Sequence, residues 1–410
     1  MRMTRFPFHR LAVLPLLAVL ALALPACDSG GTTDGPPPGN TVANGVDFTR
    51  LFGPATPAEI AAIRADWAGR TNTATGIQVS APATLPDGAR VYAVSHELTA
   101  GPGASGRHYG FVRVPAGAVN VPVIVVHHGG DSGVKLEADV FGLSQLYPTL
   151  FSQTVQVFPS YRAEPLVTST ILAPSLGATQ TSGGTASPWD YDVDDAMTLL
   201  SAVLARDEFS AATDEGRVGA LGFSRGGNTA LLHTARDPRV DAVTEYFGPT
   251  DFLNGTVQGL ALVVLGVDSP TRQGAIQLPG ARFLFENVLQ PLQGPGGTYN
   301  GSANYDAARL AIIRRSASQF TAGLRNVQIH HHRRDGVVRF PFSVVLDAAV
   351  QASRPQGAYE FNAYGEAATS DADLNTSFHS PPAMPASLAS TEQWLRRYVV
   401  APTATRVAAY

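Results

Sequence analysis

A continuous apolar run at residues 121–126 constrains the fold most, because its β-branched residues predict a strand that is buried on both faces. Such a strand belongs inside a parallel sheet with helices on either side. Beyond it, short β-rich segments alternate with segments whose apolar residues recur at helical spacing. We expect strands at 155–158, 217–222, 242–247 and 327–331, and helices near 189–204, 226–236 and 344–351. This alternation predicts an α/β unit over residues 121–401.

Two segments depart from the alternation. Residues 47–120 begin with a helix whose first residues, Thr56-Pro57-Ala58-Glu59, form a capping box. Three β-rich pieces typical of antiparallel edge strands follow, at 77–79, 90–98 and 108–114. Residues 252–312 consist of apolar pieces interrupted by Gly and Pro, and we interpret them as a cap inserted over the sheet.

The N-terminus has the features of an export signal. Arginines at positions 2, 5 and 10 precede an apolar run at 11–24 that is too short to span a bilayer comfortably. The run ends in Leu24-Pro25-Ala26-Cys27, which resembles the lipobox of bacterial lipoproteins and implies lipid attachment at Cys27. Ordinary cleavage that leaves a thiol nearby is the alternative. We expect a signal at 1–27, a flexible tether at 28–46, and a protein exported to the bacterial cell envelope, anchored to a membrane and facing the periplasm or the exterior.

Composition excludes several other classes of protein. A single cysteine rules out an intrachain disulfide and a Cys-rich zinc site. A charged fraction of 15% and a net charge of −4 argue against electrostatic binding of nucleic acid. We therefore expect no nucleic-acid or protein partner, and membrane contact only through the N-terminal lipid.

The segment Gly222-Phe223-Ser224-Arg225-Gly226 matches the Gly-x-Ser-x-Gly pattern of a nucleophile elbow. It lies between a predicted strand and a predicted helix, which is the context that the motif requires. In that turn the Ser224 hydroxyl is exposed at the carboxyl edge of the sheet. A Gly-rich turn with an incidental serine is the alternative.

A serine nucleophile needs a histidine base and a carboxylate that orients the base. In the Ser-Asp-His order typical of such elbows, His379 is the histidine that follows a plausible acid in a late loop, although it could also be a plain surface residue. Asp335, four residues past the strand end at 331, is the preferred acid, and Asp251 is the alternative. The run His330-His331-His332 does not predict a metal site, because adjacent strand residues point to opposite faces.

Two glycines after the buried strand complete the candidate site. The tetrahedral intermediate of acyl transfer carries an oxyanion that needs two hydrogen-bond donors. The first is the backbone N–H of Arg225, and the second is that of Gly129 or Gly130 in the loop His127-His128-Gly129-Gly130-Asp131. The glycines could instead serve only to make a tight turn.

Over about 121–400 the chain resembles the catalytic domain of prolyl oligopeptidase-like serine hydrolases and their dienelactone-hydrolase-like relatives. The resemblance is carried, in order, by residues 123–130, 158–162, 192–204, 222–227, 304–316 and 327–338. It implies an α/β-hydrolase fold with a mostly parallel sheet flanked by helices, here with the inserted cap and an N-terminal antiparallel extension. It also implies hydrolysis of an ester, amide or peptide through an acyl-enzyme on Ser224, with no cofactor or metal.

The chain departs from this family at several positions. The segment before residue 121 is too short for the β-propeller of the peptidases, and no tyrosine follows Tyr161-Arg162-Ala163 before Tyr191. His332 replaces a usual glycine and Arg339 a usual proline. These departures favour an esterase over a peptidase. A hydrolase of apolar polymers and a non-catalytic binding lipoprotein remain the other hypotheses.

Overall fold

The computed structural model describes residues 42–266, 269–294 and 304–402. The predicted signal at 1–27, with Cys27, lies outside these residues, as does the predicted tether up to residue 41. In the described ranges, no helix has both the length and the hydropathy needed to cross a membrane.

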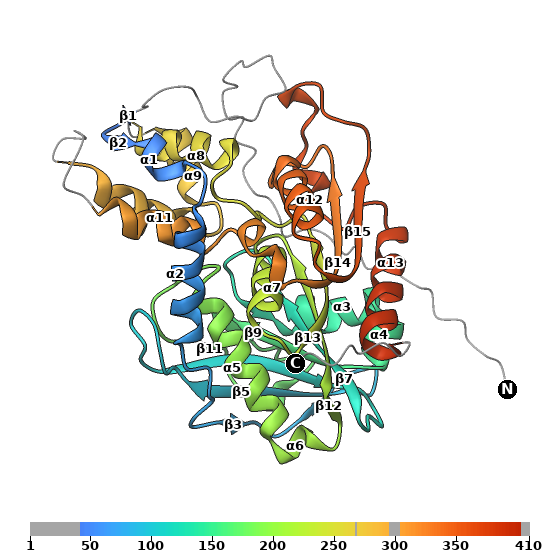
Figure 1. Cartoon of the computed structure of the whole chain (residues 1–410). Helices are drawn as coiled ribbons and strands as arrows, with labels where there is room; N and C mark the ends of the chain where they lie inside the picture. Colours follow the sequence, from blue (N-terminus) through green and yellow to red (C-terminus); the bar gives the residue numbers. More distant parts are fainter. Residues whose placement is uncertain (1–41, 267–268, 295–303, 403–410) are drawn as a thin grey trace.

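A ten-stranded sheet forms the centre of the molecule (Figure 1). Its parallel part runs in the order β15 (Gln356–Tyr364), β14 (Arg325–His332), β13 (Val240–Tyr246), β12 (Thr213–Phe223), β7 (Val121–His127) and β9 (Val155–Ser160). An antiparallel part continues from β9 through β6 (Arg107–Val114), β5 (Arg90–Glu97) and β3 (Gln78–Val79), with β4 (Ala83–Thr84) also paired to β5. The loops that follow parallel strands meet at one edge of the sheet, where the candidate site lies.

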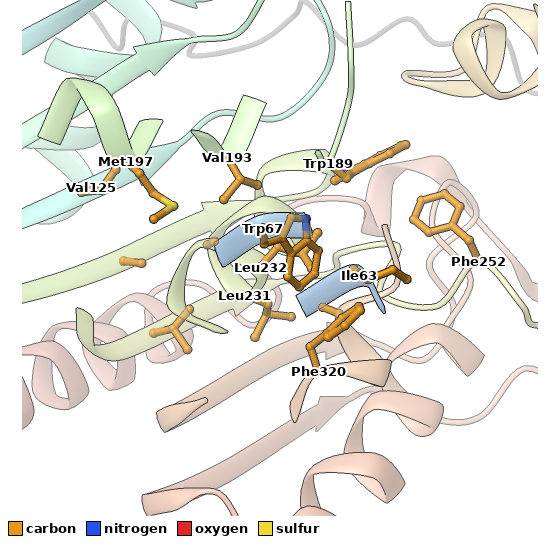
Figure 2. Close-up of a cluster of buried hydrophobic side chains, with 14 of the residues drawn as sticks. Ile63, Trp67, Val125, Trp189, Val193, Met197, Leu231, Leu232, Phe252 and Phe320 are labelled. Carbon is orange, nitrogen blue, oxygen red and sulfur yellow. The ribbon is translucent and has the colours of Figure 1, made fainter. Parts of the chain in front are cut away.

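Helices cover both faces of the sheet. One face carries α2 (Pro57–Ala68), α5 (Tyr191–Ala205), α7 (Arg225–Arg236) and α12 (Pro341–Ser353), and the other α3 (Leu143–Leu146), α4 (Pro148–Ser152) and α13 (Ala386–Leu395). Val123 and Val125 of β7 contribute to the first core, shown in part in Figure 2, and Ile124 and Val126 to the second. The prediction of a strand buried on both faces is therefore confirmed.

The N-terminal segment is more closely joined to the body than predicted. The expected capping box of α2 is present, with Thr56 and Glu59 bonded to each other's backbone N–H. β1 (Val42–Ala43) pairs with β2 (Val46–Asp47), so the prediction of a flexible tether as far as residue 46 is wrong at its end. The turn between them is Asn44-Gly45, with φ of 48° and 79°, a hairpin signal that the sequence already carried. The edge strands of 47–120 belong to the central sheet and are not a separate unit.

Residues 252–312, predicted as a cap, form several short helices in their described part. These are α8 (Gly255–Leu265), α9 (Pro270–Ile276), α10 (Ala281–Leu284), the π-helix η3 (Phe285–Leu289), the 3-10 turn η4 (Gln290–Leu292) and α11 (Tyr305–Ile313). In Figure 1 this group lies beside α1 (Phe48–Phe52) and the upper end of α2. The N-terminal segment therefore packs against the inserted one.

The sequence did not predict the end of the sheet or the last helix. The edge strand β15 is only half-buried, so it lacks the strong apolar pattern of the inner strands. Helix α13 covers the second core after a long loop. A separate three-stranded sheet, made of β8 (Val134–Lys135), β10 (Pro165–Val167) and β11 (Gln180–Thr181), borders the glycine loop after β7.

Candidate active site

Ser224 lies on the turn between β12 and α7, as the sequence predicts. Its backbone has φ of 54° and ψ of −124°, a conformation that costs a non-glycine residue energy and that tends to persist at functional sites. The turn requires glycine on both sides. A Cβ on Gly222 would lie 2.1 Å from the carbonyl oxygen of Gly226, and one on Gly226 would lie 2.2 Å from that of His127. The two glycines are therefore required by the close packing of the turn that carries Ser224.

The structure brings Ser224, His379 and Asp335 together from three distant parts of the chain. His379 Nε2 is 2.9 Å from Ser224 Oγ, and His379 Nδ1 is 2.8 Å from Asp335 Oδ2. Burial opposes ionisation of Asp335, but hydrogen bonds from His331 and His379 lower its pKa to about 2. An ionised Asp335 accepts a hydrogen bond from His379 Nδ1–H, which leaves Nε2 unprotonated and able to accept a hydrogen bond from the Ser224 hydroxyl.

The loops that carry Asp335 and His379 are bonded to each other through their backbones. Asp335 Oδ1 accepts the N–H groups of Val337 and Val338, at 2.8 and 3.1 Å. Asn375 bridges to this loop, because its N–H donates to Arg334 and its carbonyl accepts from Gly336. Four residues later, the His379 ring packs 4.4 Å from that of Phe247.

The three consecutive histidines at the end of β14 have different roles. His331 is fully buried behind the acid, with Nε2 3.5 Å from Asp335 Oδ2 and 2.9 Å from the Val338 carbonyl oxygen, and with the Ser343 hydroxyl donating to Nδ1. His330 and His332 contact other partners, Tyr364 and Phe378 respectively. No group of side chains in the described residues has the make-up of a metal site. The sequence did not predict the contact of His331 with Asp335.

Asp251, the alternative acid, lies elsewhere. Its Oδ1 accepts the N–H of Leu253 at 3.1 Å, and burial raises the pKa of this carboxyl. The carboxylate that contacts His379 is that of Asp335. Asp251 therefore caps the turn after β13.

The predicted oxyanion-binding glycines lie beside Ser224. A Cβ on Gly129 would lie 3.3 Å from the Cβ of Ser224, so the loop passes directly over the turn. Gly130 has φ of +71°, which favours glycine. The backbone of Arg225 begins α7 immediately after Ser224. The two segments expected to supply backbone N–H donors are thus adjacent.

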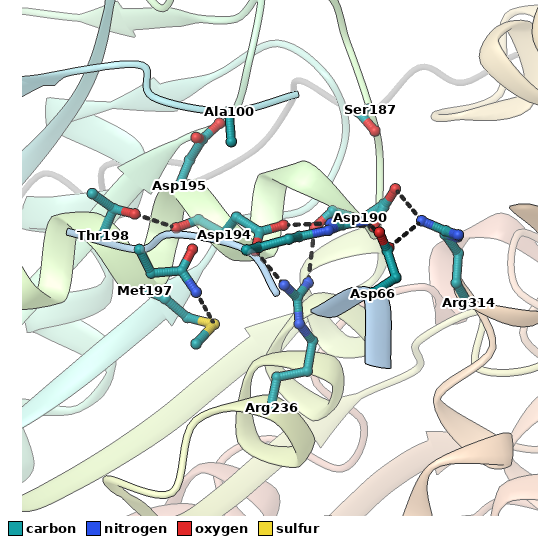
Figure 3. Close-up of polar contacts among 12 residues, drawn as sticks. Asp66, Ala100, Ser187, Asp190, Asp194, Asp195, Met197, Thr198, Arg236 and Arg314 are labelled. Atoms are coloured by element: carbon teal, nitrogen blue, oxygen red, sulfur yellow. Dashed lines mark hydrogen bonds and ion pairs between the residues drawn. The ribbon is translucent and has the colours of Figure 1, made fainter. Parts of the chain in front are cut away.

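A buried network of charges, which the sequence analysis missed, surrounds the start of α7. The Arg225 guanidinium contacts Glu164, donates to Asp192 Oδ2 at 2.6 Å and donates to the Gly130 carbonyl oxygen at 3.1 Å. Nearby, carboxylates at the start of α5 pair with arginines from other elements, namely Asp190 with Arg70, Asp194 with Arg70 and Arg236, and Asp195 with Arg162. Figure 3 shows Arg236 reaching Asp194. The acidic run at 190–195 was the sequence feature that could have indicated these buried ion pairs.

An apolar cavity lies within the cap. It is lined by Phe52, Phe252, Val257, Leu260, Ala261, Val264, Ala281, Leu284, Val288, Leu289 and Ile312. Trp189 connects this region to the nucleophile turn, because its ring lies 4.7 Å from that of Phe252 and its indole N–H donates to the Arg225 carbonyl oxygen at 3.0 Å.

Comparison with known proteins identifies the fold but no sequence family. No family model and no curated protein sequence matches the chain. Acetyl xylan esterase 1 from Thermoanaerobacterium sp. JW/SL YS485 is a structural match at 15% identity, with a TM-score of 0.52, over 86% of this chain and 98% of the esterase. The rice cell wall degrading esterase LipA from Xanthomonas oryzae matches at 16% identity, with a TM-score of 0.51, over 80% of this chain and 100% of LipA. The predicted fold class is therefore confirmed.

Proposed function

Because the chain has the α/β-hydrolase fold, we propose that it is a serine hydrolase that cleaves carboxylic esters through Ser224, His379 and Asp335. The observation that carries this proposal is the continuous hydrogen-bonded path from Ser224 Oγ to Asp335, with steps of 2.9 and 2.8 Å. A base within hydrogen-bond reach of a strained serine is a requirement of nucleophilic catalysis. A protein that only bound a ligand would not need it.

In the acylation step, His379 Nε2 takes the Ser224 proton while Oγ attacks the carbonyl carbon of the ester. The carbonyl π electrons move to oxygen, and the resulting oxyanion accepts hydrogen bonds from the N–H of Arg225 and from that of Gly129 or Gly130. Asp335 stabilises the imidazolium without taking its proton. When the tetrahedral intermediate collapses, the C–O bond to the alcohol breaks, and His379 returns the proton to the leaving oxygen.

Deacylation repeats these roles with water. His379 removes a proton from a water molecule, which attacks the acyl carbon of the Ser224 ester. The second tetrahedral intermediate releases the carboxylic acid, and the proton returns to Ser224 Oγ. No cofactor takes part in either step.

Two observations favour esters over peptides. The two solved structures compared above, each matched over at least 80% of this chain and 98% of its own, are both esterases. In addition, no tyrosine follows Tyr161-Arg162-Ala163 before Tyr191, whereas the peptidases of the resembling family carry an oxyanion-binding tyrosine shortly after this segment. We expect short aryl esters to be better substrates than aminoacyl amides, and the reverse ranking would support a peptidase.

We also propose a localisation, which the N-terminal sequence supports. An exported chain with lipid on Cys27 would act at the bacterial cell envelope, tethered to a membrane and facing the periplasm or the exterior. We expect the wild type to partition into detergent and Cys27→Ser into the aqueous phase.

A fluorophosphonate probe tests the catalytic assignment, because it reacts only with an activated serine. We expect the probe to label the wild type and to leave Ser224→Ala unlabelled. Ser380→Ala is the matched control, since this hydroxyl lies next to His379 but donates to the Ser377 carbonyl oxygen at 3.1 Å, and it should label fully.

Two other labelling results would contradict the proposed function. Equal labelling of the wild type and Ser224→Ala would refute the nucleophile assignment. Absence of labelling in the wild type, together with no turnover of an ester panel of increasing acyl length, would favour the binding-protein hypothesis.

A further inference from the structure

Glu164 lies between the two segments that are expected to bind the oxyanion. It follows β9, and only 5% of its surface is exposed. One carboxylate oxygen, Oε1, accepts a hydrogen bond from the Arg225 guanidinium. The other, Oε2, accepts the N–H of Gly133 at 3.2 Å and lies 3.5 Å from His128 Nε2. A single buried carboxylate thus contacts the start of α7 and both ends of the glycine loop.

Arg225 extends this connection to the middle of the loop. Its guanidinium donates to the carbonyl oxygen of Gly130 at 3.1 Å and lies 4.7 Å from the centre of the Tyr161 ring. The Tyr161 ring in turn stacks on that of His128 at 4.3 Å. Since Arg225 is 3% exposed, these contacts are made away from solvent, where charged hydrogen bonds are strong.

Packing alone does not hold the centre of the loop. Apart from the residues adjacent to Gly130 in the chain, no described atom lies within 4 Å of the place where a Cβ on Gly130 would stand, and Gly130 has a positive φ. A glycine without neighbours can reorient its peptide groups at little cost. Gly129 packs against the Ser224 turn, so it is the orientation of the Gly130 peptide that depends on the hydrogen bonds fixing the loop at Gly130 and Gly133.

We propose that Glu164 is a positioning residue that holds the oxyanion-binding loop over Ser224, acting through Arg225 and Gly133. This inference rests on the proposed function, because it assigns the loop to an oxyanion that the reaction has to form. Glu164 touches no reacting atom. Its effect is to fix donors that bind more strongly in the transition state than in the ground state, and such an effect lowers kcat more than it changes KM.

Asp192 provides a matched control, because it is also a buried carboxylate on the Arg225 guanidinium. Its Oδ2 accepts from Arg225, but its Oδ1 has no hydrogen-bond partner among the described residues. Asp192→Asn can keep the bond to Arg225 with the amide oxygen. Glu164→Gln cannot accept hydrogen bonds from both Arg225 and Gly133, because its amide NH₂ would face one of these two N–H donors. Each variant thus removes one negative charge from the Arg225 guanidinium, but only Glu164→Gln disturbs the hydrogen bonds that hold the glycine loop.

We expect Glu164→Gln to lower kcat for an aryl ester by about 10- to 100-fold, with KM within about threefold of the wild type, since loss of a whole oxyanion donor costs about 10²–10³. Asp192→Asn should keep kcat within about threefold. Glu164→Asp keeps the charge but is one methylene shorter, so it should fold and still lose kcat. Equal kcat in Glu164→Gln and Asp192→Asn would overturn the proposal.

Amide hydrogen exchange provides a readout that does not depend on activity. Peptides covering 128–133 should exchange faster in Glu164→Gln than in the wild type and Asp192→Asn. Unchanged exchange in Glu164→Gln would reject the positioning role even if the wild type had no hydrolase activity. Conversely, an active wild type with an inactive Ser224→Ala and no difference between the two carboxylate variants would keep the proposed function and reject this inference.

Discussion

The two sides of the candidate site are held in place by different interactions. On the nucleophile side, Ser224 and the glycine loop are backed by buried ions, with Arg225, Glu164 and Asp192 all nearly or fully excluded from solvent. On the acid–base side, Asp335 and His379 lie on loops joined by backbone hydrogen bonds around Asn375. The ion pairs beyond those loops are partly exposed.

This difference has consequences for both activity and stability. A buried ion that loses its partner costs several kcal/mol, so changes on the nucleophile side that break such a contact should affect folding and catalysis together. Exposed ion pairs contribute little, and backbone hydrogen bonds survive most side-chain changes. Apart from Asp335 and His331, which are themselves fully buried, changes on the acid–base side should therefore affect catalysis with little effect on folding.

The largest effect expected on the acid–base side is that of Asp335→Asn. We predict that kcat falls by about 10³–10⁴-fold, because the amide NH₂ would face His379 Nδ1 and favour the tautomer whose Nε2 carries a proton and cannot accept one. The amide oxygen can still accept the N–H groups of Val337 and Val338. Because Asp335 is fully buried, the variant should also melt at a lower temperature, and ester hydrolysis measured beside a thermal melt tests both effects.

The matched control for Asp335→Asn is His331→Gln, which changes the other histidine in contact with Asp335. It leaves the path from Ser224 through His379 to Asp335 intact, so its kcat should stay well above that of Asp335→Asn. If Asp335→Asn retained kcat within tenfold of the wild type, Asp335 would not be the orienting acid.

Local sequence context was enough to predict much of the site. Ser224 and Arg225 lie in a turn whose glycines are required by contacts within a few residues or on the neighbouring strand. Asp335 follows a strongly apolar strand, and His379 was selected from the order of residues along the chain. The structure brings these side chains together at the carboxyl edge of the sheet.

The connections behind the nucleophile could not be predicted in the same way. The contact of Glu164 with Arg225 joins residues 61 positions apart, and that of Arg225 with Asp192 joins residues 33 apart. Their side chains meet only after several elements pack, and no local pattern specifies such a pairing. The edge strand β15 was missed for a different reason, because its partly buried residues give no clear apolar pattern.

The second prediction concerns the pH dependence of stability on the nucleophile side. Glu245, on β13, is fully buried and accepts the N–H of Gly248 at 2.8 Å, and burial raises its pKa to about 8. The folded protein then keeps a proton that the unfolded chain releases near pH 4.5. Stability is therefore fully present below pH 4.5 and falls as the pH rises towards 8, by a few kcal/mol.

Glu245→Gln tests this prediction, because the amide does not titrate. Between pH 6 and 9 the melting temperature of the variant should fall less than that of the wild type, and part of the decline should remain because burial also raises the pKa of Asp192 to about 7. Asp335 has the opposite sign, since its pKa is lowered to about 2, so its contribution is lost only as the pH falls from about 4 to 2. Parallel alkaline declines in Glu245→Gln and the wild type would contradict the assignment.

The smallest effect is expected at Arg339, whose Nη1 donates to Asp371 at 2.7 Å on the outer side of the acid–base loops. The two side chains are 26% and 46% exposed, so solvent screens the pair, and Arg339→Ala should cost about 0.5 kcal/mol or less. Because backbone bonds around Asn375 hold the loops, kcat should stay within about twofold. Chemical denaturation and ester kinetics on the same preparation measure both quantities. A tenfold loss of kcat would mean that exposed charges also position His379, and that the two sides of the site differ less than their burial indicates.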